Sequence, residues 1–289
     1  MSSYIESLRL RTLPLSMSGI ILGTGLAMRT QSAAISGWQW LVFALAICTT
    51  LSLQILSNLC NELGDAQKGT DANQKGRQAY GLQAGTITVS QMKGMIATFI
   101  ATSVVFGIAL IYCAFGSLWN FKSLIFICLG ALAIIGAITY TLGKHSYGYM
   151  GLGDLGVFLF FGLLSTMGAF YLQAQCLTAD VIWSAIAIGL PIVGVLNLNN
   201  VRDMDNDRAH EKRTFASWLG KKGGKIYHAT LLAASLAIFA VLGHFWVLVM
   251  TPVWLWHIAF IFRHDGHDLD RQMPVLMFTT IFVSGLALV

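Results

Sequence analysis

Residues able to bind a cation lie where an apolar stretch of the chain ends. Gln54, Asn58, Asn61 and Asp65 are spaced 4, 3 and 4 residues apart, and Asp71 follows soon after. In a helix this spacing places the four polar side chains on one face. Because polar groups facing lipid are costly, that face is expected to line a cavity or meet a partner helix. Gly64 and Gly69 are expected to let the chain turn back, so that Asp71 approaches Asp65.

A second stretch of Asn and Asp residues ends a later apolar segment. Asn199, Asp203 and Asp207 are four residues apart and share a helix face, whereas Asp205 points nearly the opposite way. The Asn-x3-Asp element therefore occurs twice in the chain. We interpret this as a weak internal repeat whose two halves face each other.

Carboxylates brought together at one membrane edge would repel each other unless a cation lay between them. Mg2+ suits this arrangement, because it binds few carboxylates and is completed by water and substrate phosphates. Basic side chains that could grip a diphosphate accompany both motifs or lie on neighbouring loops, namely Arg11, Lys68, Arg77, Lys144, Arg202, Lys212 and Arg213. The combination predicts a site for a molecule with a diphosphate head and a hydrocarbon tail, such as a prenyl diphosphate.

The elements that must carry these motifs are membrane helices. Of 289 residues, 56% are hydrophobic and only 11% are charged, against about 25% charged in soluble proteins. The composition predicts a single all-α transmembrane domain over residues 1–289, with about nine helices. The expected spans lie near residues 13–28, 38–60, 92–116, 122–142, 153–174, 180–199, 226–243, 245–262 and 273–289.

Basic residues predict the orientation of these helices. With the N-terminus inside, every Lys and Arg except Arg29 and Lys122 falls on the cytoplasmic side. Both motifs then lie in long inner loops, roughly residues 62–91 and 201–225, and Thr88 begins a helix-start signature. The net charge of +5 thus reports topology in contact with membrane lipids, and no nucleic acid partner is expected.

At the two motifs the chain resembles the UbiA superfamily of intramembrane prenyltransferases. Several stretches look most like its branch acting on 1,4-dihydroxy-2-naphthoate. They are Arg11-Thr-Leu-Pro14, Asn61-Glu-Leu-Gly-Asp65, Lys68-Gly-Thr-Asp71, Tyr140-Thr-x-Gly143, Tyr147-Gly-Tyr-x-Gly-Leu-Gly153, Phe158-Leu-Phe-Phe-Gly162, Asn199-Asn-x-Arg-Asp203-x3-Asp207 and Lys212-Arg-Thr214. The resemblance implies a central cavity open to the cytoplasm and the bilayer, in a bacterial cytoplasmic membrane.

The resemblance also implies a reaction and roles for individual residues. A polyprenyl diphosphate would ionise with Mg2+, and its prenyl group would replace the carboxylate of the naphthoate, which leaves as CO2. The implied catalytic residues are Asn61, Asp65, Asp71, Asp203 and Asp207, with the same five and Asn199 as metal ligands. The implied substrate-binding residues are Arg11, Asn58, Lys68, Arg77, Tyr140, Lys144, Tyr147, Asn199, Asn200, Arg202, Lys212 and Arg213.

Other functions and residue roles are also compatible with these sequence features. Within enzymes, the acceptor could instead be 4-hydroxybenzoate or homogentisate. An ion-coupled transporter or lipid flippase fits less well, because transporters tend to place coupling residues near the membrane midplane. Asn58 is equally suited to interhelical hydrogen bonding. Residues 263–271 contain two His and three Asp, but their spacing matches no metal motif, and we interpret them as a solvated loop.

Overall fold

The computed structural model describes residues 2–30, 36–70 and 81–289, and all regular structure in them is helical. This confirms the predicted all-α class. The chain forms two compact units, which are described separately. The first comprises Met1–Leu13 and Ile35–Met150, and the second comprises Pro14–Ala34 and Gly151–Val289.

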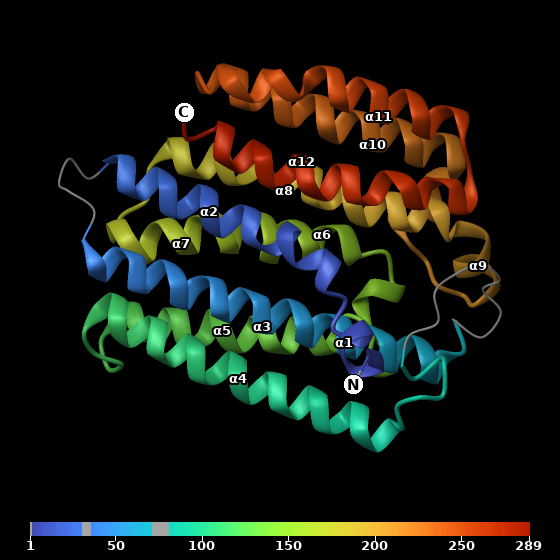
Figure 1. Cartoon of the computed structure of the whole chain (residues 1–289), viewed down its shortest axis with the longest axis horizontal. Helices are drawn as coiled ribbons and strands as arrows, with labels where there is room; N and C mark the ends of the chain where they lie inside the picture. Colours follow the sequence, from blue (N-terminus) through green and yellow to red (C-terminus); the bar gives the residue numbers. More distant parts are fainter. Residues whose placement is uncertain (1, 31–35, 71–80) are drawn as a thin grey trace. The chain divides into compact units, whose positions relative to one another are not determined.

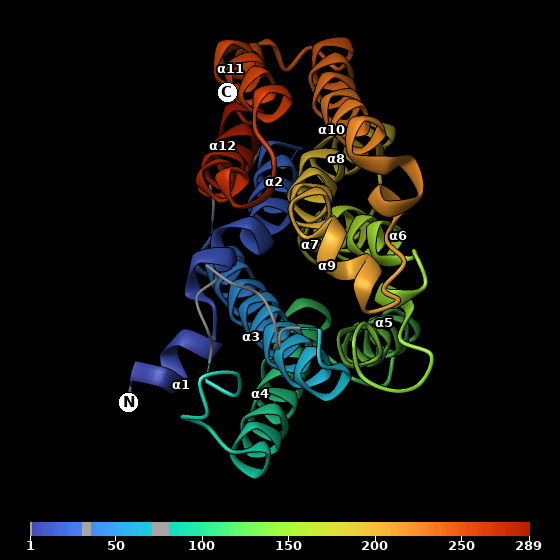
Figure 2. The same cartoon turned by 90° about the vertical axis from the view of Figure 1, so that its right-hand side faces the viewer.

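Three long helices form most of the first unit. Its elements are α1 (Ser2–Ser7), η1 (Leu10–Thr12), α3 (Gly37–Lys68), α4 (Val89–Phe115), α5 (Phe121–Thr139) and η2 (Tyr147–Tyr149). Helix α3 packs against both α4 and α5, as Figure 2 shows nearly end-on. Apolar residues of α3, including Leu56 and Leu59, meet Met92 and Ile96 of α4 in the core. The Thr88 hydroxyl and the Gln91 side chain cap α4 reciprocally, which confirms the predicted helix start.

The two glycines of the first motif have different roles. Gly69 ends α3 with a φ of 71°, a left-handed conformation that glycine adopts without strain, so the predicted turn at this residue is confirmed. The expected turn at Gly64 is wrong, because α3 continues through it to Lys68. A Cβ at Gly64 would collide with the Thr141 side chain. Gly64 therefore allows the segment after α5 to approach α3.

The second unit is organised around one buried helix. Its elements are α2 (Leu13–Thr30, from Pro14 onward), α6 (Gly153–Val157), the π-helical η3 (Phe158–Leu164), α7 (Ser165–Ala174), α8 (Ala179–Arg202), α9 (Met204–Ala209), α10 (Phe215–Val241), η4 (Phe245–Met250), α11 (Thr251–Arg263), η5 (Gly266–Arg271) and α12 (Gln272–Leu286). Helix α8 packs against α10, η3 and α12 (Figure 1). Its most apolar stretch is 72% buried, against 39% or less in the other apolar spans.

Two glycines bring α8 and η3 into backbone contact. A Cβ added to Gly162 would lie 2.8 Å from the Gly189 Cα. Such close approach is the packing that small residues permit between membrane helices.

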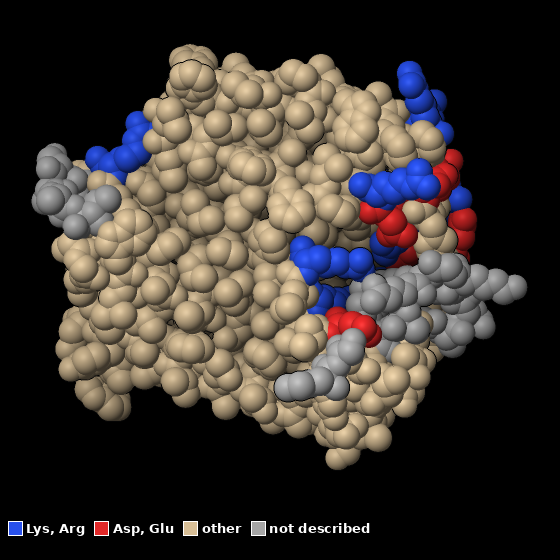
Figure 3. All heavy atoms as spheres, viewed as in Figure 1, with Lys and Arg blue, Asp and Glu red and all other residues tan. Residues whose placement is uncertain are grey.

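Seven helical segments of the described chain are long and apolar enough to cross a membrane, and they match the predicted second to eighth spans. The predicted first and ninth spans are helical as α2 and α12, with 18 and 15 residues, but are not among those seven. The count of nine is therefore not confirmed. On the face shown in Figure 3, charged side chains gather at helix ends and the surface between them is uncharged, as expected for a multi-pass membrane protein.

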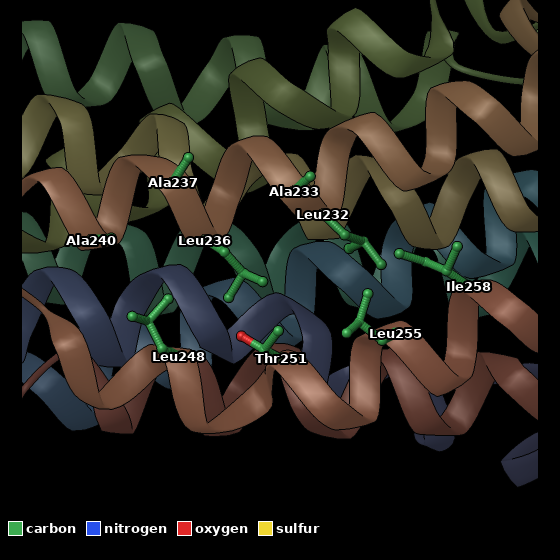
Figure 4. A pocket seen from close by; sticks show the side chains of 9 residues that line it. All are labelled: Leu232, Ala233, Leu236, Ala237, Ala240, Leu248, Thr251, Leu255 and Ile258. Atoms are coloured by element: carbon green, nitrogen blue, oxygen red, sulfur yellow. The ribbon is translucent and has the colours of Figure 1, made fainter.

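An apolar groove of about 340 Å3 lies within the second unit between α10 and the η4–α11 segment. Figure 4 shows the side chains of Leu236, Leu248 and Leu255 converging on it. Thr251 supplies the one hydroxyl among the lining side chains. The groove is lined by residues of two apolar spans, so its surface is compatible with hydrocarbon. None of its lining residues belongs to the two aspartate motifs.

Candidate active site

In the first unit, the carboxylate of Asp65 is held by a tyrosine from the segment after α5. The Tyr149 hydroxyl lies 2.7 Å from Asp65 Oδ1 and donates to it. The same hydroxyl lies 2.7 Å from the Thr70 hydroxyl, just beyond the end of α3. Helix α3, its C-terminal turn and η2 are thus joined at the Tyr149 hydroxyl.

Asn61 and Lys68, about two turns apart on α3, bind the same segment. The Thr141 hydroxyl donates to Asn61 Oδ1 at 2.5 Å. Lys68 Nζ donates to the Thr141 carbonyl at 2.8 Å and to the Ser146 hydroxyl, and it lies 3.6 Å from the centre of the Tyr149 ring. A cation over an aromatic ring is attracted by the ring quadrupole. The segment after α5 therefore contacts Asn61, Asp65 and Lys68 together. The common face of Asn61 and Asp65 was predicted from their spacing, and Lys68 was predicted only to accompany the motif.

Sequence reasoning singled out Tyr147 in this segment and missed Tyr149. The Tyr147 hydroxyl donates to the Gly136 carbonyl at 3.1 Å, and its ring meets Tyr140 edge to face at 5.2 Å. The pair of tyrosines in Tyr147-Gly148-Tyr149 was the available signal. They lie in a 3-10 helix, where three residues make a turn and residues two apart point about 120° apart. Tyr149 is the tyrosine that contacts the motif.

Burial raises the pKa of Tyr147 to about 12, because the charged phenolate is poorly solvated there. The unfolded tyrosine titrates near pH 10. The stability contributed by neutral Tyr147 is therefore complete below about pH 10 and is expected to fall as the pH rises from about 10 to about 12. Thermal unfolding at pH 9 and pH 11 measures this, and Tyr147→Phe should show a smaller drop than the parent protein.

Asn58 and Glu62 of α3 form hydrogen bonds with other segments of the first unit. Asn58 Nδ2 donates to the Leu8 carbonyl at 3.0 Å and to the Thr12 hydroxyl at 3.1 Å. These contacts support the alternative in which Asn58 has a packing role, and its substrate-binding role stays a prediction. Glu62 Oε1 accepts from the Ser7 hydroxyl and from the Leu82 backbone N–H, at 3.2 and 2.8 Å.

In the second unit, Arg202 grips the carboxylate of the adjacent Asp203 with two parallel hydrogen bonds. Nε lies 2.7 Å from Oδ1 and Nη2 lies 2.5 Å from Oδ2. The third nitrogen, Nη1, lies 2.5 Å from Asp270 Oδ1 in η5. The Arg202 side chain is only 7% exposed, so the guanidinium is a buried cation between two carboxylates.

The remaining acids of the second motif separate as helix phase predicts. Asp207 is buried, and Lys212 Nζ lies 3.3 Å from its Oδ1. Asp205 is 76% exposed and pairs with Lys221 at 2.7 Å. The exposure of Asp205 agrees with the prediction that it points away from the other two acids. The shared face of Asp203 and Asp207 stays a prediction, because α8 ends at Arg202 and α9 begins at Met204.

Residues 263–271 are more tightly bound to the second unit than the predicted solvated loop. Asp265 and the His264 carbonyl both accept from the buried Lys225 ammonium, at 2.8 and 2.7 Å. Leu269 is fully buried. Within residues 2–30, 36–70 and 81–289, no group of three or more His, Cys, Asp or Glu could hold a metal, so the metal interpretation of this loop gains no support.

The other predicted residues are distributed over both units. Arg11, Lys144 and Arg213 are exposed, Tyr140 and Asn199 are partly buried, and Asn200 is buried. Asp71 and Arg77 lie outside the described residues. The structure therefore forms each motif separately, and the expected meeting of the two motifs stays a prediction.

Comparisons with known proteins decide the family. The family model described as the UbiA prenyltransferase family matches residues 19–282. The chain belongs to the UbiA prenyltransferase family. The 1,4-dihydroxy-2-naphthoate octaprenyltransferase of Escherichia coli (strain K12) is 42% identical over 88% of this chain and 79% of that protein. The enzyme of that name from Mycobacterium tuberculosis is 30% identical, over 81% and 75% of the two chains.

Solved structures share the UbiA fold with this chain. A UbiA homolog from Archaeoglobus fulgidus, bound to GPP and Mg2+, aligns with a TM-score of 0.67 over 99% of both chains at 13% identity. The apo structure of a UbiA homolog from Aeropyrum pernix K1 aligns with a TM-score of 0.63, over 96% of this chain and 97% of the other, at 17% identity. The predicted membrane prenyltransferase fold is confirmed.

The donor atoms of both motifs fit Mg2+. Asp65, Asn61, Asp203 and Asp207 offer oxygen ligands, which hard cations prefer. Each motif contributes few carboxylates, as expected for an ion that keeps water and phosphate ligands. A UbiA enzyme could therefore hold Mg2+ with these residues.

Removing the Tyr149 hydroxyl tests the first motif in this UbiA chain. Hydrogen bonds to charged groups contribute about 1.5–3 kcal/mol, so Tyr149→Phe is expected to lower kcat about tenfold as Asp65 loses its donor. Prenyl transfer assays at saturating substrates measure this effect. Tyr112→Phe, which removes the hydroxyl of an exposed tyrosine on α4, is the control and should retain a rate within about threefold of the parent rate.

Proposed function

We propose that this chain catalyses the Mg2+-dependent transfer of a polyprenyl group from a polyprenyl diphosphate to 1,4-dihydroxy-2-naphthoate. The product is a prenylated naphthoquinol, formed with release of CO2 and diphosphate. The observation that carries the proposal is the 42% identity over most of the chain to an enzyme named for this reaction. The two aspartate motifs, each organised by partly buried hydrogen bonds, give the assignment a chemical basis.

The residues of the second unit are suited to binding and orienting a diphosphate. Arg202 and Lys212 place cationic groups beside Asp203 and Asp207. In the first unit, Lys68 is fixed beside Asp65 by the segment carrying Tyr149. Fixed charges of this kind stabilise developing charge without reorganising during the reaction.

Bond changes in the proposed reaction balance without an oxidant. The C–O bond from the prenyl carbon to the diphosphate breaks, and diphosphate leaves with the electron pair. When bound, Mg2+ supplies Lewis-acid stabilisation of that leaving group. The ring carbon that carries the carboxylate forms the new C–C bond. Loss of CO2 returns its bonding pair to the ring and restores aromaticity.

The positive-inside pattern supports a bacterial cytoplasmic membrane location with both motifs on the cytoplasmic side. The C-terminal ends of α3 and α8 carry the motifs in their respective units. On the proposed topology both ends meet the aqueous side where diphosphate and Mg2+ are available. The apolar surfaces of the spans then accommodate the hydrocarbon tail from within the bilayer.

The full-length protein, purified in detergent and in liposomes, provides the test. It is incubated with prenyl diphosphates of several lengths, Mg2+ and one acceptor at a time: 1,4-dihydroxy-2-naphthoate, 4-hydroxybenzoate or homogentisate. Mass spectrometry is expected to find a decarboxylated, prenylated naphthoate that disappears when EDTA replaces Mg2+. A product from one of the other acceptors alone would reassign the substrate. Absence of product with all three would contradict the enzyme assignment.

A further inference from the structure

The loop before α12 contacts the second aspartate motif through a single guanidinium. Arg202 Nε and Nη2 bind both carboxylate oxygens of Asp203, and Nη1 binds Asp270 Oδ1 at 2.5 Å. Asp270 lies 67 positions after Asp203 in the sequence, in η5. The spacing between these residues carries no motif, so the contact emerges only in the folded second unit.

The three side chains differ in burial, and this determines their roles. Arg202 is 7% exposed and Asp203 is 12% exposed, whereas Asp270 is 44% exposed. A buried guanidinium needs hydrogen-bond acceptors for its N–H groups. Asp203 accepts hydrogen bonds from Nε and Nη2 of Arg202, and Asp270 accepts one from Nη1, which points away from the motif.

Asp270 also changes the charge of the group. Arg202 and Asp203 alone would form a neutral pair, in which the guanidinium offsets the carboxylate. With Asp270 included, two carboxylates share one cation, and the group carries a net charge of −1 when the neighbouring His267, whose Nδ1 lies 3.3 Å from Asp270 Oδ2, is neutral. A net negative charge near a cation site strengthens cation binding.

The loop is held so that Asp270 can act in this way. Lys225 of α10 is 7% exposed and binds both Asp265 and the His264 carbonyl. Leu269, next to Asp270, is fully buried in the core of the second unit. These contacts fix η5 on both sides of the exposed Asp268.

We propose that Asp270 is a positioning residue for prenyl transfer: through Arg202 it fixes the carboxylate of Asp203 and keeps this edge of the motif negative. This inference rests on the proposed function. Asp270 need not contact the metal or the substrate. Asp270 lets Asp203 bind a divalent cation while the Asp203 oxygens remain oriented by Arg202.

The test compares Asp270→Asn with Asp268→Asn, which removes the same charge from an exposed position of the same loop. The Mg2+ concentration giving half-maximal rate is expected to rise about tenfold in Asp270→Asn, since one unit of negative charge is lost near the cation site. The rate at saturating Mg2+ should fall much less. Asp268→Asn should behave as the parent protein.

A readout independent of turnover is the thermal stabilisation by Mg2+ with inorganic pyrophosphate. The Mg2+ concentration giving half of that stabilisation is expected to rise about tenfold in Asp270→Asn as well. Asp270→Glu restores the charge and should bring both values to within about threefold of the parent values. If Asp270→Asn fails to fold, Asp270→Ser is measured in its place with the same expected rise. Mg2+ values in Asp270→Ser equal to those of Asp268→Asn would then contradict the role.

A double-mutant cycle tests whether Asp270 acts through Arg202. In an Arg202→Gln background, Asp270→Asn is expected to cause a change in Mg2+ dependence well below tenfold, since effects that depend on one shared contact are not additive. An undiminished tenfold effect in that background would overturn the proposal, as would equal Mg2+ dependence in Asp270→Asn and Asp268→Asn. A parent protein that forms no product would count against the proposed function, and the pyrophosphate measurement would still decide the role of Asp270.

Discussion

Replacing Asp203 by Asn is expected to lower kcat at least about 100-fold, the effect typical of removing a preorganised charge from an active site. Asn keeps the size of the side chain but removes the charge that Arg202 and a divalent cation share. The Arg202 fork would keep one acceptor and face an amide N–H in place of the other. Prenyl transfer rates at saturating Mg2+ and substrates measure the change.

Asp205→Asn is the matched control for this prediction. Asp205 lies two residues away in the same motif, is 76% exposed and pairs with Lys221. Exposed ion pairs contribute about 0–1 kcal/mol, so its removal should alter neither rate nor stability greatly. Comparable losses in Asp203→Asn and Asp205→Asn would show that the motif acts through its overall charge and not through the buried face.

Asp65→Asn is expected to have a similarly large effect, again about 100-fold or more in kcat. Its carboxylate accepts from Tyr149, and the amide could replace that acceptor while lacking the charge needed by a cation. The loss should therefore greatly exceed that of Tyr149→Phe, which removes the donor and keeps the charge. Initial rates across a range of Mg2+ concentrations distinguish the two variants.

Gln67→Ala controls for disturbance of the end of α3. Gln67 is exposed and lies two residues after Asp65 in the same helix. It should retain the parent rate and melting temperature. A rate for Asp65→Asn within threefold of the Gln67→Ala rate would remove Asp65 from the metal assignment.

Much of the fold could be predicted because periodic apolar segments determine membrane helices. The cap at Thr88 and the end of α3 at Gly69 also follow from local chemistry, since each depends on residues within one turn. Gly64 was misread because its reason is not local. It accommodates Thr141, which lies 77 positions away in the sequence, and no spacing rule reveals such a contact.

The candidate site likewise combines local features, which could be predicted, with contacts from distant segments, which could not. Helix phase correctly separated Asp205 from Asp203 and Asp207, because all three lie within two turns. Tyr149 and Asp270 were missed, since each reaches its aspartate motif from a distant segment. Residues 263–271 looked solvated because they are rich in charge. Charged residues in a loop are equally compatible with ion pairs to buried cations, and composition alone does not separate the two cases.

The contact between Gly162 and Gly189 limits how this family can diverge. With no side chain between the two backbones, the distance from η3 to α8 is already at its minimum. A relative that carries even a methyl group at either position must therefore hold these helices farther apart. Such a spacing change would have to be absorbed by the neighbours of α8, so substitutions at the glycine pair should appear together with altered side-chain volumes on α10 or α12.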